Sequence, residues 1–172
     1  MAKKISLIFL NLLVFTFILP FGAFAEADGF GDLKWGTYIS TLEDLRYVRT
    51  DPNYGGIEIY SREGDELKFV DHELKSLEYG FWQDKFYSVS MKFQGDVNIS
   101  SFVEKFDLGY KPDSLIERYV WSSELTRMLL EYSEASREWS LFISSKEINI
   151  QQIKYDSEKV RSSIKVGLKQ KR

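Results

Sequence analysis

Two apolar patterns with a period of two residues, joined by a dipeptide, constrain the fold of this chain most strongly. The patterns place Leu77, Tyr79 and Phe81 on one side of a first segment, and Tyr87, Val89, Met91 and Phe93 on one side of a second. Side chains that alternate in this way share one face of a β-strand. The intervening Gln83-Asp84 is short enough for a tight hairpin. The sequence therefore predicts two antiparallel strands, each with one buried face.

Similar patterns predict the other strands and three helices. Further strands are expected around Ile57 and Ile59, Leu67 and Phe69, Tyr119 and Trp121, Met128, Leu130 and Tyr132, and Trp139, Leu141 and Ile143. Three serines at 40, 101 and 144 each precede a glutamate by three residues, a spacing that allows a capping box at a helix start. We therefore expect helices over about 41–48 and 101–108 and from 144 towards the C-terminus. Turn-forming residues over 51–56 end the first of them.

The order of these segments indicates an internal duplication. Residues 40–45 match 101–106, the tripeptide from Leu77 recurs at Leu130, and the tripeptide from Tyr87 recurs at Trp139. The predicted fold class is α+β, with an antiparallel sheet built from two helix-plus-strands (α-β-β-β-like) units and a C-terminal helix. The two units are expected over about 37–95 and 96–145.

Residues 1–25 have the pattern of an export signal. Lys3 and Lys4 precede an apolar run over 5–19, Pro20 and Gly22 follow it, and residues 23–25 are Ala-Phe-Ala. An uncleaved membrane anchor is the competing interpretation, but this run is shorter than the ~20 residues that span a bilayer. We expect cleavage after Ala25, a single α+β domain over 26–157, and a periplasmic or secreted protein with no stable membrane span.

Charge is unevenly distributed along the chain. Residues 26–157 carry 15 basic and 25 acidic side chains, whereas residues 158–172 carry six basic and one acidic. An acidic body does not favour nucleic acid, which needs a basic surface. The basic C-terminal tail at 158–172 has four interpretations: a solvated, partly frayed terminus, or a contact with anionic lipid, with an acidic partner or with the body itself.

Composition excludes several kinds of chemistry. The chain has no cysteine, which rules out thiolate catalysis, cysteine-bound metals and a lipid-bearing cysteine after the apolar run. His72 is the single histidine, so no histidine pair can bind zinc, and we expect it in a solvated turn. Residues 51–62 begin like a calcium loop, but Arg62 occupies the position of the bidentate glutamate. We expect no cofactor, no metal and no catalytic residue.

Two tryptophans are the candidate binding residues. Trp35 precedes Gly36-Thr37 and is interpreted as a packing plug in front of a tight turn, with a ligand contact as the alternative. Trp82 falls on the opposite strand face from Leu77 and is therefore expected to be exposed beside the hairpin turn. Other aromatic residues with the same alternatives of core or binding surface are Tyr54, Tyr110, Trp121 and Trp139.

The sequence resembles a family of small uncharacterised exported bacterial proteins. The resemblance lies in Phe30 with Trp35-Gly36-Thr37, and in the strand Glu78-Tyr79-Gly80-Phe81. It covers most of the chain after the signal and implies no activity. A more remote similarity is to the small lipoproteins of outer-membrane β-barrel assembly, which are binding modules.

We therefore predict an exported, non-enzymatic binding or envelope-associated protein whose partner is an envelope protein. The alternative is a carbohydrate-directed binder or hydrolase that uses exposed aromatics and a carboxylate pair. Glu78 and Glu131 are the candidate pair, because they occupy matched positions of the two repeats, although each is expected to face solvent.

Overall fold

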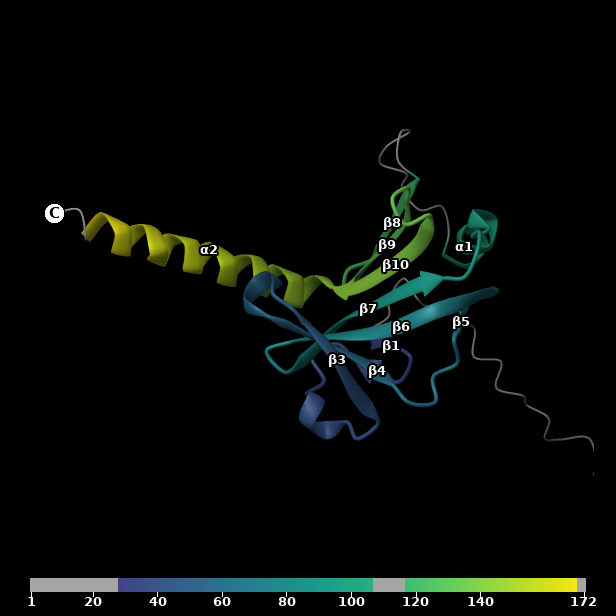
Figure 1. The fold of residues 1–172 in the computed structure, drawn as a ribbon, viewed down its shortest axis with the longest axis horizontal. Helices are drawn as coiled ribbons and strands as arrows, with labels where there is room; N and C mark the ends of the chain where they lie inside the picture. The colour runs from purple at the N-terminus through teal and green to yellow at the C-terminus, as the bar shows by residue number, and fades with distance from the viewer. Residues whose placement is uncertain (1–27, 107–116, 170–172) are drawn as a thin grey trace, which may run out of the picture.

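A single antiparallel sheet forms the body of the protein in the computed structural model, which describes residues 28–106 and 117–169 (Figure 1). The strand order is β3-β4-β6-β7-β10-β9-β8, with the short β5 paired to β6. The strands are β3 (Leu45–Asp51), β4 (Ile57–Arg62), β5 (Lys68–Phe69), β6 (His72–Trp82), β7 (Lys85–Phe93), β8 (Arg118–Ser122), β9 (Thr126–Ser133) and β10 (Glu138–Ser145). A separate hairpin pairs β1 (Gly29–Phe30) with β2 (Leu33–Lys34). The helices are α1 (Ile99–Phe106) and α2 (Lys146–Lys169).

The structure confirms the α+β class, the antiparallel sheet and the C-terminal helix. It does not confirm the two-unit architecture. The first predicted helix is wrong: residues 39–41 form a single 3-10 turn and 45–51 form the edge strand β3. The ladder with β4, from Leu45↔Arg62 to Asp51↔Ile57, supplies the backbone hydrogen bonds of this segment. Strand pairing between distant residues overrides a local helix signal in this way.

The strand pairing in the sheet also disagrees with the sequence match between the two predicted units. Leu77 pairs with Met91, and Leu130 pairs with Leu141. If Leu77 and Leu130 are equivalent, Met91 should correspond to Leu141. The sequence match instead aligns Val89 with Leu141, two residues away.

The predicted hairpin is confirmed. Trp82 pairs with Lys85, and Gln83 and Asp84 between them both have positive φ values, 48° and 62°. Two consecutive residues with positive φ make a turn whose twist matches that of the flanking strands. The β6–β7 connection is therefore as short as the sequence indicates.

A β-bulge beside this hairpin divides the apolar residues between two faces of the sheet. Gly80 pairs with Ser88 and Phe81 with Phe86, which leaves Tyr87 as an extra residue in β7. An extra residue reverses the alternation on its strand. Phe86 and Val89 therefore face the main core, whereas Tyr87 joins the opposite face. The expectation that Tyr87 shares a face with Val89 is wrong for this reason.

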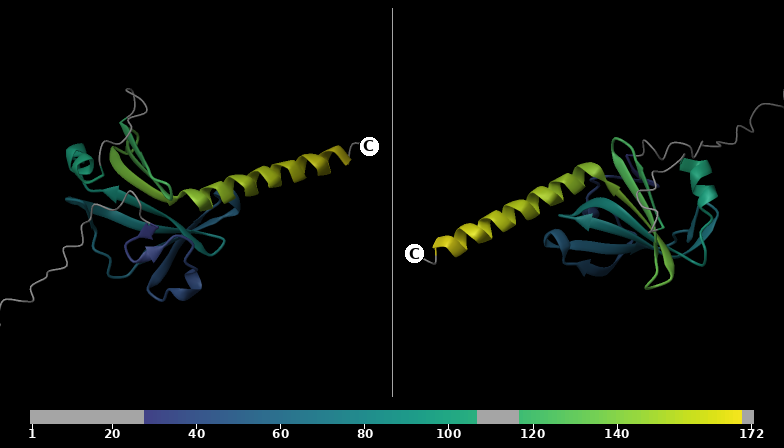
Figure 2. Two further views of the ribbon diagram at one scale, coloured as in Figure 1. Left: turned by 180° about the vertical axis from the view of Figure 1, so that it is seen from behind. Right: turned by 90° about the horizontal axis from the view of Figure 1, so that it is seen from above.

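The main core lies on one face of the sheet, which is curved between its two edges (Figure 2). Its fully buried side chains come from β6, β7, β9, β10 and α1, and include Phe81, Phe86, Val89, Met91, Phe93, Phe102, Leu130, Leu141 and Ile143. Phe102 of α1 lies 5.8 Å from Phe93 and 6.3 Å from Trp121, measured between ring centroids. The helix thus closes the core between β7 and the far edge strand β8.

A smaller cluster lies on the other face, beneath the start of α2. It contains Ile57, Trp82, Tyr87 and Ile148, with Tyr54, Ile59 and Phe142 packed against it. Beyond this contact α2 runs away from the sheet, so that most of the helix extends outside the body (Figure 1).

Both α-helices begin near the predicted positions but use other caps. In α1 the side chain of Asn98 accepts a hydrogen bond from the Ser100 amide at 3.1 Å. In α2 the Ser145 hydroxyl accepts from the Ile148 amide at 3.3 Å. The predicted caps Ser101 and Ser144 are therefore wrong, by three residues in α1 and by one residue in α2. The predicted export signal, the predicted end of the second helix at about residue 108, and Tyr110 lie outside the described residues.

Truncation of either matched leucine tests the core. We expect Leu77→Ala and Leu130→Ala each to lower the free energy of unfolding by ~2–5 kcal/mol, because both side chains lie in the main core. Leu130, with no exposed surface, should lose more than Leu77, which is 9% exposed. Urea denaturation measures both. Leu125→Ala is the control, because Leu125 is exposed, and its loss should stay within ~0.5 kcal/mol.

Candidate functional site

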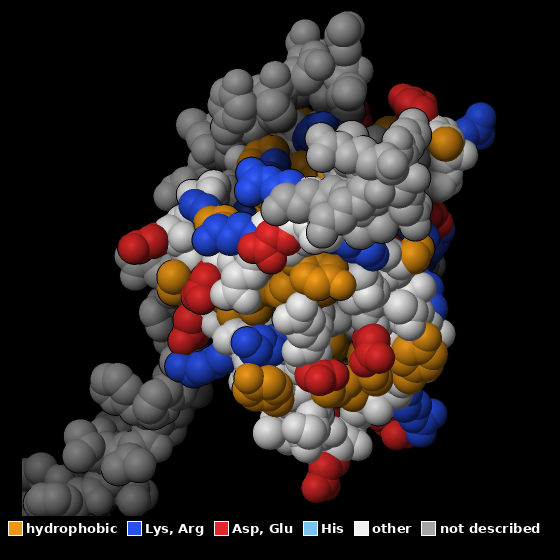
Figure 3. Space-filling model, turned by 90° about the vertical axis from the view of Figure 1, so that its left-hand side faces the viewer, with side chains coloured by type: hydrophobic (Ala, Val, Ile, Leu, Met, Phe, Trp, Pro, Cys, Tyr) orange, Lys and Arg blue, Asp and Glu red, His pale blue; other side chains and the backbone are white. Residues whose placement is uncertain are grey.

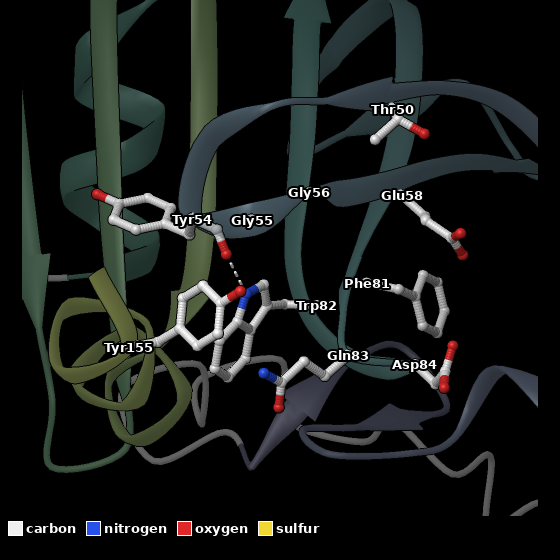
Figure 4. Close-up of a pocket in the computed structure, with 10 residues that line it drawn as sticks. All are labelled: Thr50, Tyr54, Gly55, Gly56, Glu58, Phe81, Trp82, Gln83, Asp84 and Tyr155. Carbon is white, nitrogen blue, oxygen red and sulfur yellow. Dashed lines mark hydrogen bonds between the residues drawn. The ribbon is translucent and has the colours of Figure 1, made fainter. Parts of the chain in front are cut away.

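A cleft of about 270 Å³ lies at the end of the sheet beside the N-terminal part of α2 (Figure 4). Three parts of the chain build it: the end of β3 with the following turn and the start of β4, the end of β6 with the β6–β7 turn, and the first turns of α2. The lining residues are Thr50, Tyr54, Gly55, Gly56, Glu58, Phe81, Trp82, Gln83, Asp84 and Tyr155.

An aromatic wall forms one side of the cleft. The Trp82 indole donates a hydrogen bond to the Tyr54 carbonyl oxygen at 2.9 Å. Tyr155 of α2 lies edge-on to Trp82, with 5.9 Å between ring centroids and an interplanar angle of 79°. Trp82 is only 4% exposed, whereas Tyr155 is 37% exposed. Tyr155 is therefore the accessible aromatic residue of the wall, and the buried Trp82 packs against it.

The predicted exposure of Trp82 is wrong. Its side chain lies on the face opposite Leu77, as its position in the strand indicates, but it is buried and not exposed. The reason is that α2 covers this face at Ile148. No pattern within β6 reveals that a helix more than sixty residues later packs there.

The turn before β4 brings the backbone close to Tyr155. Gly55 has a φ of 85°, and a Cβ atom at this position would lie 2.7 Å from the Tyr155 ring. Tyr54 also has a positive φ, of 51°. The Asp51 carboxylate accepts a hydrogen bond from the Asn53 amide at 2.9 Å, so its oxygen stabilises the turn. The interpretation of residues 51–56 as a turn is confirmed.

An acidic wall lines the cleft on the side of Phe81, on the opposite face of the sheet from Trp82. In Figure 4 the Phe81 ring lies between the carboxylates of Glu58 and Asp84. The Tyr60 hydroxyl donates to Glu58 at 2.8 Å. Burial, together with this bond to Glu58, raises the pKa of Tyr60 to about 12, so the phenol stays protonated and keeps donating at neutral pH. No lysine or arginine is among the described residues that line the cleft.

Trp35 lies elsewhere, against the main core. Its indole donates to the Thr126 hydroxyl at 2.9 Å, and its ring stacks on Phe86 with 4.9 Å between centroids. The following Gly36 has a φ of 84°. Trp35 thus links the segment after β2 to β9 and packs as a plug in front of a tight turn, as the sequence predicts.

The predicted carboxylate pair is held by arginines outside the cleft. Arg49 binds Glu78 through two hydrogen bonds of 2.6 and 2.7 Å. Arg118 forms an ion pair with Glu131. The two glutamates lie on β6 and β9, which β7 and β10 separate in the sheet. The structure therefore does not bring Glu78 and Glu131 together in one site.

His72 is not the solvated turn residue that its charged neighbours indicate. It begins β6, and its Nε2 accepts a hydrogen bond from the Asn98 amide at 2.9 Å. Its ring packs against Phe93 and Phe102, with 6.0 and 5.6 Å between centroids. His72 thus connects the start of β6 to the segment that leads into α1.

Comparisons with known proteins add no relative. No family model, no curated protein and no solved structure matches the chain. Within residues 28–106 and 117–169, no helix has the length and apolar content needed to cross a membrane. The same residues contain no group of three or more histidine, aspartate or glutamate side chains placed to hold a metal ion.

Two glycine substitutions test the contact between the turn and α2. Gly55→Ala and Gly64→Ala both put a side chain on a backbone with φ near 85°, which costs ~1–2 kcal/mol in unfolding free energy. Only the Cβ at Gly55 meets Tyr155, whereas Gly64 has open space around it. We expect Gly55→Ala to be the more destabilised variant in urea denaturation, and to change the near-UV circular dichroism of the aromatic wall. Equal losses and unchanged spectra in both variants would contradict the contact.

Proposed function

We propose that this chain is an exported, non-enzymatic binding protein of the cell envelope that holds its ligand in the cleft beside the N-terminal part of α2. The observation that carries the proposal is the combination of the aromatic wall and the acidic wall in one cleft of about 270 Å³. This size is near the lower end of small-molecule sites. A pocket with hydrophobic walls and a few polar groups on one side both holds and orients a ligand.

The charge of the lining favours a ligand with a positively charged group. Glu58 and Asp84 bring two carboxylates and no described lining residue brings a compensating cation. The accessible Tyr155 ring lines the same cleft, and the faces of aromatic rings attract cations. The face from which α2 projects carries acidic, basic and hydrophobic side chains (Figure 3), so the attraction for a cation comes from the two carboxylates of the cleft itself.

Export is part of this proposal. It rests on the charged start, the apolar run over 5–19 and the Ala-Phe-Ala sequence at 23–25. Expression of the full chain in a bacterial host, followed by N-terminal sequencing of the periplasmic material, tests it. A mature protein that begins at Glu26 supports export with cleavage after Ala25, and retention of Met1 in the membrane fraction supports the anchor instead.

A carbohydrate-directed binder or hydrolase remains the second candidate. The specific observation in its favour is that Tyr155, an accessible ring, shares the cleft with the carboxylates of Glu58 and Asp84. Sugars stack on aromatic rings, and their hydroxyl groups hydrogen-bond to carboxylates. For a hydrolase, Glu58 and Asp84 would replace Glu78 and Glu131 as the carboxylate pair.

The internal duplication also stays a proposal. Its support is the sequence match and the arrangement of the sheet, in which β6–β7 and β9–β10 are hairpins that meet along β7 and β10.

Ligand titration separates the two functional candidates. We expect an arylammonium ion such as benzyltrimethylammonium to change the tryptophan fluorescence, and neutral soluble glycans to leave it unchanged. Asp84→Asn and Glu58→Gln should each weaken binding about tenfold, or ~1.4 kcal/mol, because each removes one of the two carboxylates. Glu134→Gln, an exposed glutamate in the β9–β10 loop, is the matched control and should bind normally.

The tryptophan signal can be assigned with two further variants. Trp82→Phe should abolish the fluorescence change, whereas Trp35→Phe should retain it, because Trp35 lies outside the cleft lining. A response to glycans that depends on Trp82 would favour the carbohydrate candidate. The absence of any response to either class of probe would overturn the cleft as the binding site.

A further inference from the structure

The projecting helix α2 has a buried stripe and an exposed apolar stripe on different sides. Ile148 and Gln152 are buried against the body, at 5% and 1% exposure. Ile150, Ile153 and Val160 are 53%, 53% and 59% exposed. At ~100° per residue, the centres of the two stripes lie roughly 150° apart around the helix axis. One stripe attaches α2 to the sheet, and the other, which we call the outer seam, faces away from its own body.

The outer seam has the spacing of a coiled coil. Ile150, Ile153, Ser157 and Val160 follow one another at intervals of three, four and three residues, and Ile164 continues the spacing in the sequence. In heptad terms, Ile150, Ser157 and Ile164 occupy a positions, and Ile153 and Val160 occupy d positions. The seam is narrow and contains no aromatic residue. A helix that lies on a membrane surface instead presents a broad apolar face, commonly with Trp or Phe.

We propose that the outer seam pairs with the outer seam of a second copy of this chain to form a parallel two-stranded coiled coil. Charge decides both the partner and the direction. Asp156 lies at a g position and Arg161 at the e position five residues later. In a parallel pair, a g residue faces the e residue of the next heptad on the other helix. Asp156 of each copy therefore meets Arg161 of the other, twice per dimer.

An antiparallel pair would lose this complementarity. It places e positions opposite e positions, so Lys154 and Arg161 of one copy would face the same two cations of the other. Like charges in such proximity are destabilising. The parallel arrangement is consequently the one that the flanking charges favour.

The position of the body is compatible with a parallel dimer. Each seam points away from the sheet to which its helix is attached, so the two bodies lie on opposite outer sides of the helix pair. Tyr155 contacts Trp82 of its own body and is not a seam residue. The cleft therefore stays open in the dimer, and the dimer and the ligand site are independent. Because the seam spans fewer than the three to four heptads of a self-sufficient coiled coil, the association is expected to be weak.

Disulfide trapping tests the pairing directly, since the chain contains no cysteine of its own. Ile153→Cys places a thiol at a d position, where a parallel pair brings the two copies of the residue together. Ser162→Cys, an exposed position on the opposite side of the helix, is the matched control. Under mild oxidation at high protein concentration, we expect Ile153→Cys to form disulfide dimers at least tenfold faster than Ser162→Cys. An antiparallel pair would bring Ile153 opposite residues near 164 and would leave the two rates alike.

Sedimentation analysis of charge variants supplies the second readout. Arg161→Asp should raise the dimer dissociation constant at least tenfold, and the double variant Asp156→Arg with Arg161→Asp should restore it. Concentration-independent monomer, with equal trapping of both cysteine variants, would overturn the proposal. So would binding of monomeric protein to anionic lipid vesicles through the same seam. None of these results bears on ligand binding in the cleft, so the two proposals fail separately.

Discussion

The ladder between β7 and β10 is the interaction on which the rest of the structure depends. It pairs Val89 with Ile143 and Met91 with Leu141, residues about fifty positions apart, and all four side chains have no exposed surface. Burial of each such side chain contributes ~1.5–3 kcal/mol. This ladder joins the β3–β7 and β8–β10 parts into one sheet, which gives α1 a core to cover. It also sets the direction of β10, and therefore the place where α2 begins.

The bulge at Tyr87 determines what happens on the other face. Because one extra residue reverses the alternation in β7, the hairpin end of the sheet carries apolar side chains on both sides. Phe81 and Phe86 belong to the main core, while Trp82 and Tyr87 pack with Ile148 of α2 on the other face. The cleft exists because α2 packs on this face through Ile148, which brings Tyr155 beside Trp82 and Gly55. The candidate site is thus a consequence of a backbone irregularity and a helix contact, and neither is a catalytic motif.

The predictions from sequence succeed where a local pattern has one structural solution. The period-two runs and the Gln83-Asp84 turn are such cases, and so is the packing of Trp35. They fail where distant residues compete with a local signal. Residues 45–51 become an edge strand because β4 pairs with them from Leu45 to Asp51 around one irregularity at Val48. His72 is partly enclosed because Phe102 packs on its ring and the Asn98 amide donates to it. Of the two candidate binding residues, Trp82 lines the cleft and Trp35 does not. Tyr155, Glu58 and Asp84 carry no local signal that would have singled them out.

The amino-acid sequence by itself determined the class of fold, the order of the strands from β4 onward, the tight hairpin and the asymmetry between an acidic body and a basic C-terminus. These properties follow from side-chain alternation, turn chemistry and charge, all of which act over a few residues. Only the tertiary structure decided which strands are neighbours, which face each residue occupies beyond the bulge, and that Trp82 is covered. The physical reason is that these outcomes depend on burial against segments far along the chain. A helix that packs on a sheet changes the exposure of a strand residue without changing anything in the sequence around it.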